Sequence, residues 1–231
     1  MSRHARRALG LRPGNEQQEG GPPLLRALRD NGLSLAFWAL FAASLAGTVL
    51  AGFALQAEHH AGTTSAASLW SYAVSPDLLR SVLVNWQAAV LQLLVLVLLA
   101  RLLRQRGAAH SRRPGEDESA AENAREHTRS WLYRHSLSLA LAALFALTLA
   151  GFVLADWPAY NDERARLGER SLDFAHYLRS ARLWSNLFQT WEAEFFAMAG
   201  FLILGIFLRE EDSAESKPIG AADAQTGGVN E

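Results

Sequence analysis

Four long apolar stretches with almost no charge constrain the fold of this chain more than any other feature of its sequence. They cover residues 33–55, 81–100, 136–155 and 195–208. About 20 apolar residues at about 1.5 Å each in a helix cross a hydrocarbon core of about 30 Å. The fourth stretch is short, so its helix must reach back to residue 189. The pattern therefore predicts an all-α membrane protein with four transmembrane helices, over 33–55, 81–103, 136–156 and 189–208.

Polar segments separate and flank these helices. Residues 1–24 are rich in Arg, Gly and Pro and predict a disordered tail, as do residues 210–231, whereas 105–130 predict a charged linker. A mean hydropathy of +0.02 averages these segments with the apolar ones. A cleaved signal peptide is the alternative for 33–55, but this apolar run of 23 residues is too long and its preceding tail too extended.

The distribution of Arg and Lys predicts the orientation in the membrane. The two tails and the central linker with its flanks hold 16 of the 22 basic residues, and the two other loops hold 6. Because positive loops stay in the cytoplasm, both termini and the linker are expected there. Abundant Ala, Leu and Arg with a single lysine, Lys217, suggest a GC-rich, bacterial genome, and hence the bacterial inner membrane.

The two halves of the chain resemble each other. A shift of 104 places residues 33–51 over 137–155 with 14 of 19 positions identical, and a shift of 105 aligns Ser75 with Ser180 and Trp86 with Trp191. We therefore predict two tandem helical-hairpin repeats, 25–104 and 131–209, related by a pseudo-two-fold axis along the membrane normal. In the second outer loop, apolar residues recur at helical spacing over 171–188 and predict an interfacial helix. The equivalent segment 68–83 contains Pro76 and is expected to be bent or shorter.

Two further patterns concern helix packing and membrane depth. Small residues four apart, which let helix backbones approach closely, are Gly47 with Ala51 and Gly151 with Ala155. They favour packing within the monomer over specific dimerisation. Tryptophans near the predicted helix ends are expected to act as interfacial anchors; these are Trp86, Trp131, Trp157, Trp184 and Trp191.

Glu192 and Glu194 are the leading candidates for ion interaction, because carboxylates inside a nominal span are costly and often functional. The competing interpretation places them in the first turn of the fourth helix, where the helix dipole favours negative charge. Asn85, Gln87 and Gln92 could line a polar pathway, although hydrogen bonding between helices is the simpler role.

No metal, cofactor or catalytic site is expected. Glu58-His59-His60 could supply metal ligands, but adjacent histidines in a polar loop are usually solvated. The chain has no cysteine and no Walker, GxSxG or HExxH motif, and its only histidine near a span is His135, which disfavours a haem-binding bundle. A net charge of −1 gives no reason to expect nucleic-acid binding.

Four short motifs resemble those of a known family: Asn31-Gly32-Leu33-Ser34, Tyr177-Leu178-Arg179-Ser180, Trp191-Glu192-Ala193-Glu194-Phe195 and Glu215-Ser216-Lys217-Pro218. Over about residues 26–218 the chain resembles a domain-of-unknown-function family of small bacterial membrane proteins. The resemblance implies four membrane helices and no assigned activity. The first outer loop, with Glu58-His59-His60 and Pro76, departs from the second-half pattern.

These observations favour a non-catalytic membrane component whose partners are the lipid bilayer and either another membrane protein or further copies of itself. The alternative is a small oligomeric transporter or channel that uses Glu194 and Gln92 in a water-filled cavity.

Overall fold

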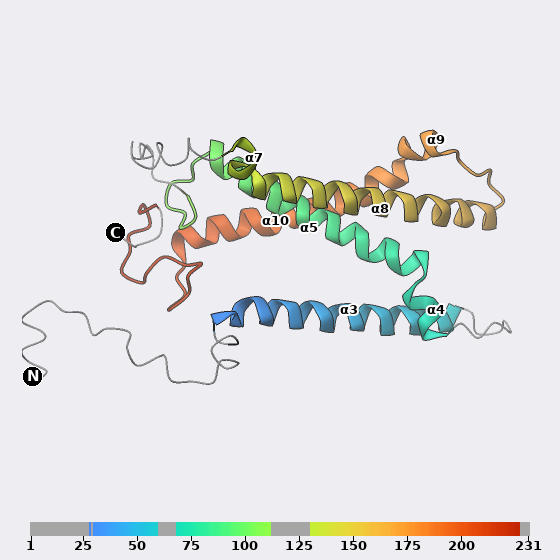
Figure 1. Ribbon diagram of the computed structural model, residues 1–231, viewed down its shortest axis with the longest axis horizontal. Coiled ribbons are helices and arrows are strands. Elements are labelled where there is room, and N and C mark those ends of the chain that lie inside the picture. The colour runs from blue at the N-terminus through green and yellow to red at the C-terminus, as the bar shows by residue number, and fades with distance from the viewer. Residues whose placement is uncertain (1–27, 29, 60–67, 112–129, 227–231) are drawn as a thin grey trace, which may run out of the picture. The chain divides into compact units, whose positions relative to one another are not determined.

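The computed structural model describes residues 28, 30–59, 68–111 and 130–226, and in these ranges the chain is all-helical. Its helices, in chain order, are α3 (Gly32–His59), α4 (Leu69–Ala73), α5 (Pro76–Leu102), α7 (Trp131–Arg134), α8 (Ser136–Arg166), α9 (Phe174–Leu178) and α10 (Ala181–Phe207) (Figure 1). The predicted tail 1–24 and most of the linker 105–130 lie outside the described residues.

Within the described ranges, four helical stretches are long and apolar enough to cross a membrane: Gly32–Glu58, Leu69–Leu102, Ser136–Arg166 and Phe174–Phe207. Each contains one of the four predicted transmembrane segments or nearly all of it. The predicted all-α fold with four such helices is therefore confirmed, and the chain is a multi-pass membrane protein.

The chain divides into two units, residues 1–69 and 70–231. The first unit contains α3, a continuous helix of 28 residues that carries no acidic residue in its first turn. Its length of about 42 Å, at about 1.5 Å per residue, exceeds the thickness of a hydrocarbon core. Its apolar side chains include Trp38 and Phe41, whose rings meet edge to face at 5.5 Å.

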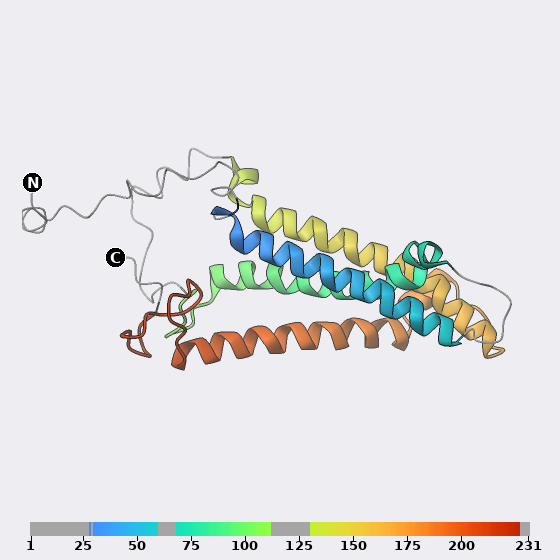
Figure 2. The same ribbon diagram turned by 90° about the horizontal axis from the view of Figure 1, so that it is seen from below.

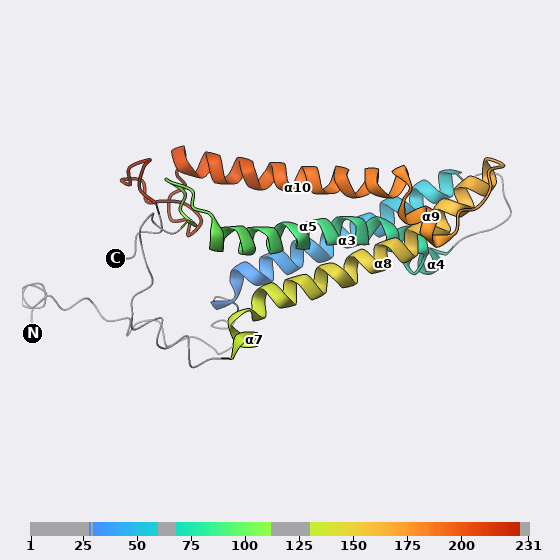
Figure 3. The same cartoon turned by 90° about the horizontal axis from the view of Figure 1, so that it is seen from above.

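In the second unit, α5 lies between α8 and α10 (Figures 2 and 3). The best-packed part of this unit is a cluster of four buried side chains, namely Phe152, Tyr177, Leu183 and Leu187. They come from α8, α9 and α10, and Leu83 and Val84 of α5 pack against them. The short helix α9 thus contributes to the core.

The start of α5 and that of α10 are built alike. In each case a five-residue helix precedes a serine whose side chain caps a 27-residue helix: Ser75 Oγ accepts from the Leu78 amide, and Ser180 Oγ from the Leu183 amide. Pro76 at the first position of α5 suits a helix start, because it has no amide hydrogen to leave unpaired. Both helices therefore begin several residues before their apolar runs.

These caps correct the expectation for residues 171–188. That segment is not one helix, because α9 ends at Leu178 and α10 begins at Ala181. The predicted apolar spacing is real, but it belongs to two helices: Tyr177 of α9 and Leu183 and Leu187 of α10 are all buried.

One predicted small-residue pair lies at a helix crossing. A Cβ atom at Gly151 of α8 would be 3.0 Å from Leu83 Cδ1 of α5, and Ala155 on the same face is buried. The Gly151–Ala155 pair therefore packs within the chain. Gly47 and Ala51 lie on α3, in the other unit, so their packing role stays a prediction.

The C-terminal segment 208–226 differs from the predicted disordered tail. Lys217 is fully buried, and its Nζ donates to the backbone oxygens of Ala222, Asp223 and Gln225 at 3.4, 3.0 and 3.4 Å. The Gly107 amide donates to Thr226 Oγ1 at 2.8 Å, which ties the segment to the end of α5. Burial lowers the pKa of Lys217, as does the nearby Arg209. A polar composition does not prevent order here, because one lysine satisfies three carbonyl groups.

Candidate functional site

A buried ionic cluster joins α5, α8 and α9. Asp156 is 0% exposed, its Oδ1 accepts from Arg80 Nη1 at 3.1 Å, and its Oδ2 accepts from the Tyr177 hydroxyl at 2.8 Å. An isolated buried carboxylate is strongly destabilising, whereas one with a cation and a second donor is tolerated. Both oxygens of Asp156 therefore have partners inside the fold.

Local structure positions each member of this cluster. The Ser75 cap starts α5 so that Arg80 falls in its second turn, and Asp156 is near the end of the apolar part of α8. Tyr177 is held because the loop before α9 is fixed to α8. The Leu172 backbone oxygen accepts from both the Trp157 indole and the Asn161 amide at 2.9 Å, and the Leu172 amide donates to Asn161 Oδ1 at 2.8 Å.

The cap of α9 also orders this loop. Asp173 Oδ1 accepts from the His176 amide at 2.9 Å, and the Asp173 Oδ2 atom lies 2.7 Å from His176 Nδ1. The backbone hydrogen bond and the imidazole contact lower the pKa of Asp173. Gly168, at φ +74, provides the left-handed residue that ends α8.

A polar cavity of about 280 Å³ lies beside the ionic cluster. Its lining comes from three helices: Arg80, Ser81 and Val84 of α5, Phe152 and Asp156 of α8, and Arg182, Asn186, Gln189 and Thr190 of α10. Arg182 Nη2 is 3.2 Å from Glu163 Oε2, and its guanidinium lies 5.5 Å from the Tyr160 ring centroid. We call this the two-arginine cavity, after Arg80 and Arg182.

Gln87 links α5 to α10. Its side chain is 0% exposed; its Nε2 donates to Thr190 Oγ1 at 3.3 Å, and its Oε1 accepts from the Trp191 indole at 2.9 Å. This is the inter-helix hydrogen bonding that the sequence favoured for Gln87. Asn85 donates instead to the Ser81 oxygen of its own helix, at 2.9 Å.

Gln92 lines a second, mostly apolar cavity of about 630 Å³ between α5 and α10. Phe195, Met198 and Leu202 form part of its α10 wall, but Glu194 is not among its lining residues. The cavity therefore does not bring Gln92 and Glu194 together, although the predicted water-filled pathway requires that they share a cavity.

Glu192 and Glu194 lie about three turns inside α10, because the helix begins at Ala181. The interpretation that these carboxylates lie in the first turn is therefore wrong. The positive N-terminal end of α10 is too far away to stabilise their charge. Glu192 is exposed and Glu194 is half-buried. Neither forms an ion pair with another residue in the described ranges.

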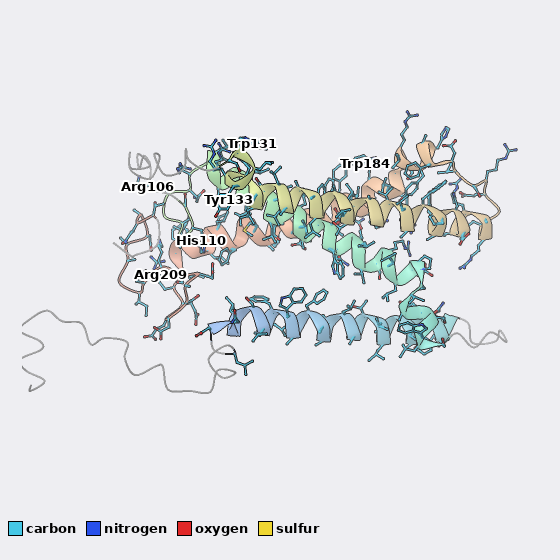
Figure 4. All side chains as sticks on the ribbon, in the orientation of Figure 1. Arg106, His110, Trp131, Tyr133, Trp184 and Arg209 are labelled. Atoms are coloured by element: carbon cyan, nitrogen blue, oxygen red, sulfur yellow. The ribbon has the colours of Figure 1, made fainter. Side chains whose placement is uncertain are left out.

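The predicted tryptophan anchors fall into two groups. The Trp157 and Trp191 indoles donate to Leu172 and Gln87 and pack against the core cluster. Trp86, Trp131 and Trp184 are 39%, 56% and 43% exposed. Figure 4 shows Trp131 at α7 and Trp184 near the start of α10.

The histidine motif of the first outer loop cannot be placed. Glu58 is exposed at the end of α3, while His60 and the side chain of His59 lie outside what the structure describes.

The sequence patterns did not predict a site formed by Asp156, Arg80, Tyr177 and Arg182. A signal existed for the ion pair: Arg80 directly precedes the charge-free run 81–100, and Asp156 directly follows the run 136–155. In the predicted topology these positions share one membrane side. Opposite charges at helix ends on the same membrane side indicate an ion pair. The positions of Tyr177 and Arg182 could not be inferred in this way, because they depend on the break between α9 and α10.

The four candidate membrane helices of the described ranges define a multi-pass membrane protein, and comparison with known families adds a domain family of unknown function. Residues 24–228 match the model of the Domain of unknown function (DUF6766) family, so the chain belongs to that family. No curated protein and no solved structure matches it.

Proposed function

We propose that this protein is a non-catalytic component of a bacterial inner membrane that works together with another membrane protein or with further copies of itself. The single observation that supports this proposal most is how polar groups are used inside the helix bundle. Both Asp156 and Gln87 are fully buried. Asp156 accepts hydrogen bonds from Arg80 and Tyr177, and Gln87 forms hydrogen bonds with Thr190 and Trp191. Groups engaged in this way stabilise a scaffold and are not free to act as a general acid or base.

The proposal includes an architecture of two tandem hairpins. It is supported by the equal lengths of α4 and α9, and of α5 and α10, at a shift of 105 that also aligns the capping serines. Both hairpins then have the same orientation, with both termini in the cytoplasm. The excess of Arg and Lys in the tails and linker supports this orientation.

The mass of the intact assembly tests the component role. Solubilised gently from its native membrane, the protein is expected in a complex heavier than the 25.3 kDa chain, with detergent and lipid subtracted. Light scattering coupled to size exclusion measures this mass. A homogeneous 25.3 kDa species at several mild detergent conditions would contradict the proposal.

A small transporter or channel is the second candidate. It is favoured by the position of Glu194, half-buried about three turns inside α10, because carboxylates at membrane depth are costly and commonly serve ion movement. The expected result for this candidate is cation or proton flux into liposomes that Glu194→Gln reduces about tenfold or more, a loss of about 1.4 kcal/mol.

Glu211→Gln, which removes an exposed carboxylate beyond the end of α10, is the matched control. It should leave the flux unchanged. Absence of flux from the wild-type protein, or equal flux in Glu194→Gln, would remove this candidate.

A further inference from the structure

We propose that the two-arginine cavity binds a phosphate-type oxyanion, presented either by the headgroup of an anionic lipid or as a free ion. The cavity has a suitable volume, about 280 Å³, and its walls come from α5, α8 and α10, so its shape is set by the packed core. Seven of its nine lining residues are polar or charged.

The two arginines have more donors than the protein uses. A guanidinium carries five N–H groups. Arg80 donates one hydrogen bond to Asp156, and its contact with Asp77 is long, at 3.9 Å; Arg182 is 3.2 Å from Glu163. The Nε atoms of both arginines are buried without an acceptor in the described part of the chain. Planar guanidinium groups bind phosphate oxygens in pairs of hydrogen bonds.

The dipole of α10 adds to the positive potential of this cavity. Arg182 is in the first turn of α10, where the dipole disfavours a cation, and the first turn of α10 contains no acidic residue. Arg80 is in the second turn of α5. An oxyanion in the cavity would compensate the charge of Arg182 and the N-terminal end of α10, whereas the start of α5 already has Asp77 in its first turn.

Three carboxylates lie near the two arginines, and an oxyanion must compete with them for the guanidinium N–H groups. Asp156 is fully engaged by Arg80 and Tyr177, so it is part of the scaffold. Asp77 and Glu163 have side chains 63% and 50% exposed, and neither lines the cavity. Glu163 is therefore an exchangeable partner that an incoming oxyanion displaces from Arg182.

Asn186 supplies a further donor. It lies one helical turn from Arg182 on α10 and lines the same cavity, and no hydrogen bond joins its side-chain amide to another described residue. Arg80 on α5 and both Arg182 and Asn186 on α10 thus provide hydrogen-bond donors on two walls of the cavity.

Two substitutions at the ion pair of Arg182 and Glu163 are expected to have effects of opposite sign. Arg182→Gln removes a charged donor and should weaken oxyanion binding about tenfold or more, whereas Glu163→Gln removes the competitor and should strengthen it. Arg179→Gln, at an exposed arginine outside the cavity, is the matched control for net charge and should change binding less than about twofold.

Two probes distinguish the sources of the anion, both with the full-length chain. Calorimetry with inorganic phosphate tests the free ion, and native mass spectrometry after exchange into phosphatidylglycerol or phosphatidylcholine micelles tests the lipid. Binding of phosphate alone supports a free-ion site, and retention of phosphatidylglycerol alone supports a headgroup site, if either follows the predicted order of variants.

The proposal is overturned if neither probe binds, or if Arg182→Gln and Arg179→Gln lose binding equally. It is also overturned if Glu163→Gln binds no more tightly than the wild type. Thermal unfolding of each variant by circular dichroism shows whether a loss of binding comes from a loss of fold.

Discussion

At the scale of single residues, the fold depends on a few buried polar groups that have complete sets of partners. Asp156 illustrates the principle, because Arg80 neutralises its charge and the Tyr177 hydroxyl satisfies its second oxygen. Lys217 does the same for three backbone carbonyl groups at the other end of the unit. In both places, removing one partner leaves the other buried and unsatisfied.

Tyr177→Phe should therefore destabilise the protein without changing its packing volume much. Loss of the hydroxyl leaves Asp156 Oδ2 without its donor, at a cost of about 1–3 kcal/mol. Tyr160→Phe is the control, since Tyr160 is nearby and half-buried but its hydroxyl forms no hydrogen bond within the described ranges. Thermal unfolding in detergent should show a lower Tm for Tyr177→Phe only; equal Tm values would contradict the role of this hydrogen bond.

The residue scale also shows the limit of sequence reasoning about the site. Gln87 was predicted to bond between helices, and it does, because a polar side chain within an apolar run has few other partners. The pair formed by Arg80 and Asp156 was not predicted. Both residues flank charge-free runs, so Arg80 was counted in an outer loop and Asp156 was only the last residue of a predicted span.

At the scale of helices, apolar runs predicted which segments are helical but not where the helices begin. Helix α5 begins at Pro76 and α10 at Ala181, several residues before their predicted spans. Their starts are set by capping serines and by Pro76, which are local backbone effects independent of hydropathy. This difference changes the interpretation of Glu192 and Glu194, which are well inside α10.

Helix packing could be predicted from the sequence where a pair of small residues lies at a helix crossing. Gly151 approaches Leu83 so closely that a Cβ atom would be 3.0 Å from its side chain, as expected for a small-residue crossing. The order of the C-terminal segment was not predictable. It depends on the backbone oxygens of Ala222, Asp223 and Gln225 converging on Lys217, and composition does not encode that geometry.

At the scale of the whole molecule, the four candidate membrane helices and the distribution of charge combine into one topology. Because 16 of the 22 basic residues lie in the tails and the central linker with its flanks, those segments should remain in the cytoplasm. The two-arginine cavity then lies toward the outer side, since Arg80 and Arg182 are near the helix ends opposite to the linker.

Reporter fusions test this topology directly. Alkaline phosphatase, which is active only outside the cytoplasm, should be active when fused after Gly62 or Gly168 and inactive after Gly115. Green fluorescent protein, which folds in the cytoplasm, should give the reverse pattern at the same three positions. A fusion after Gly220 is the internal control, because the C-terminal segment should share the compartment of Gly115. Phosphatase activity after Gly115 would invert the proposed orientation and place the two-arginine cavity on the cytoplasmic side, where free phosphate is the more accessible oxyanion.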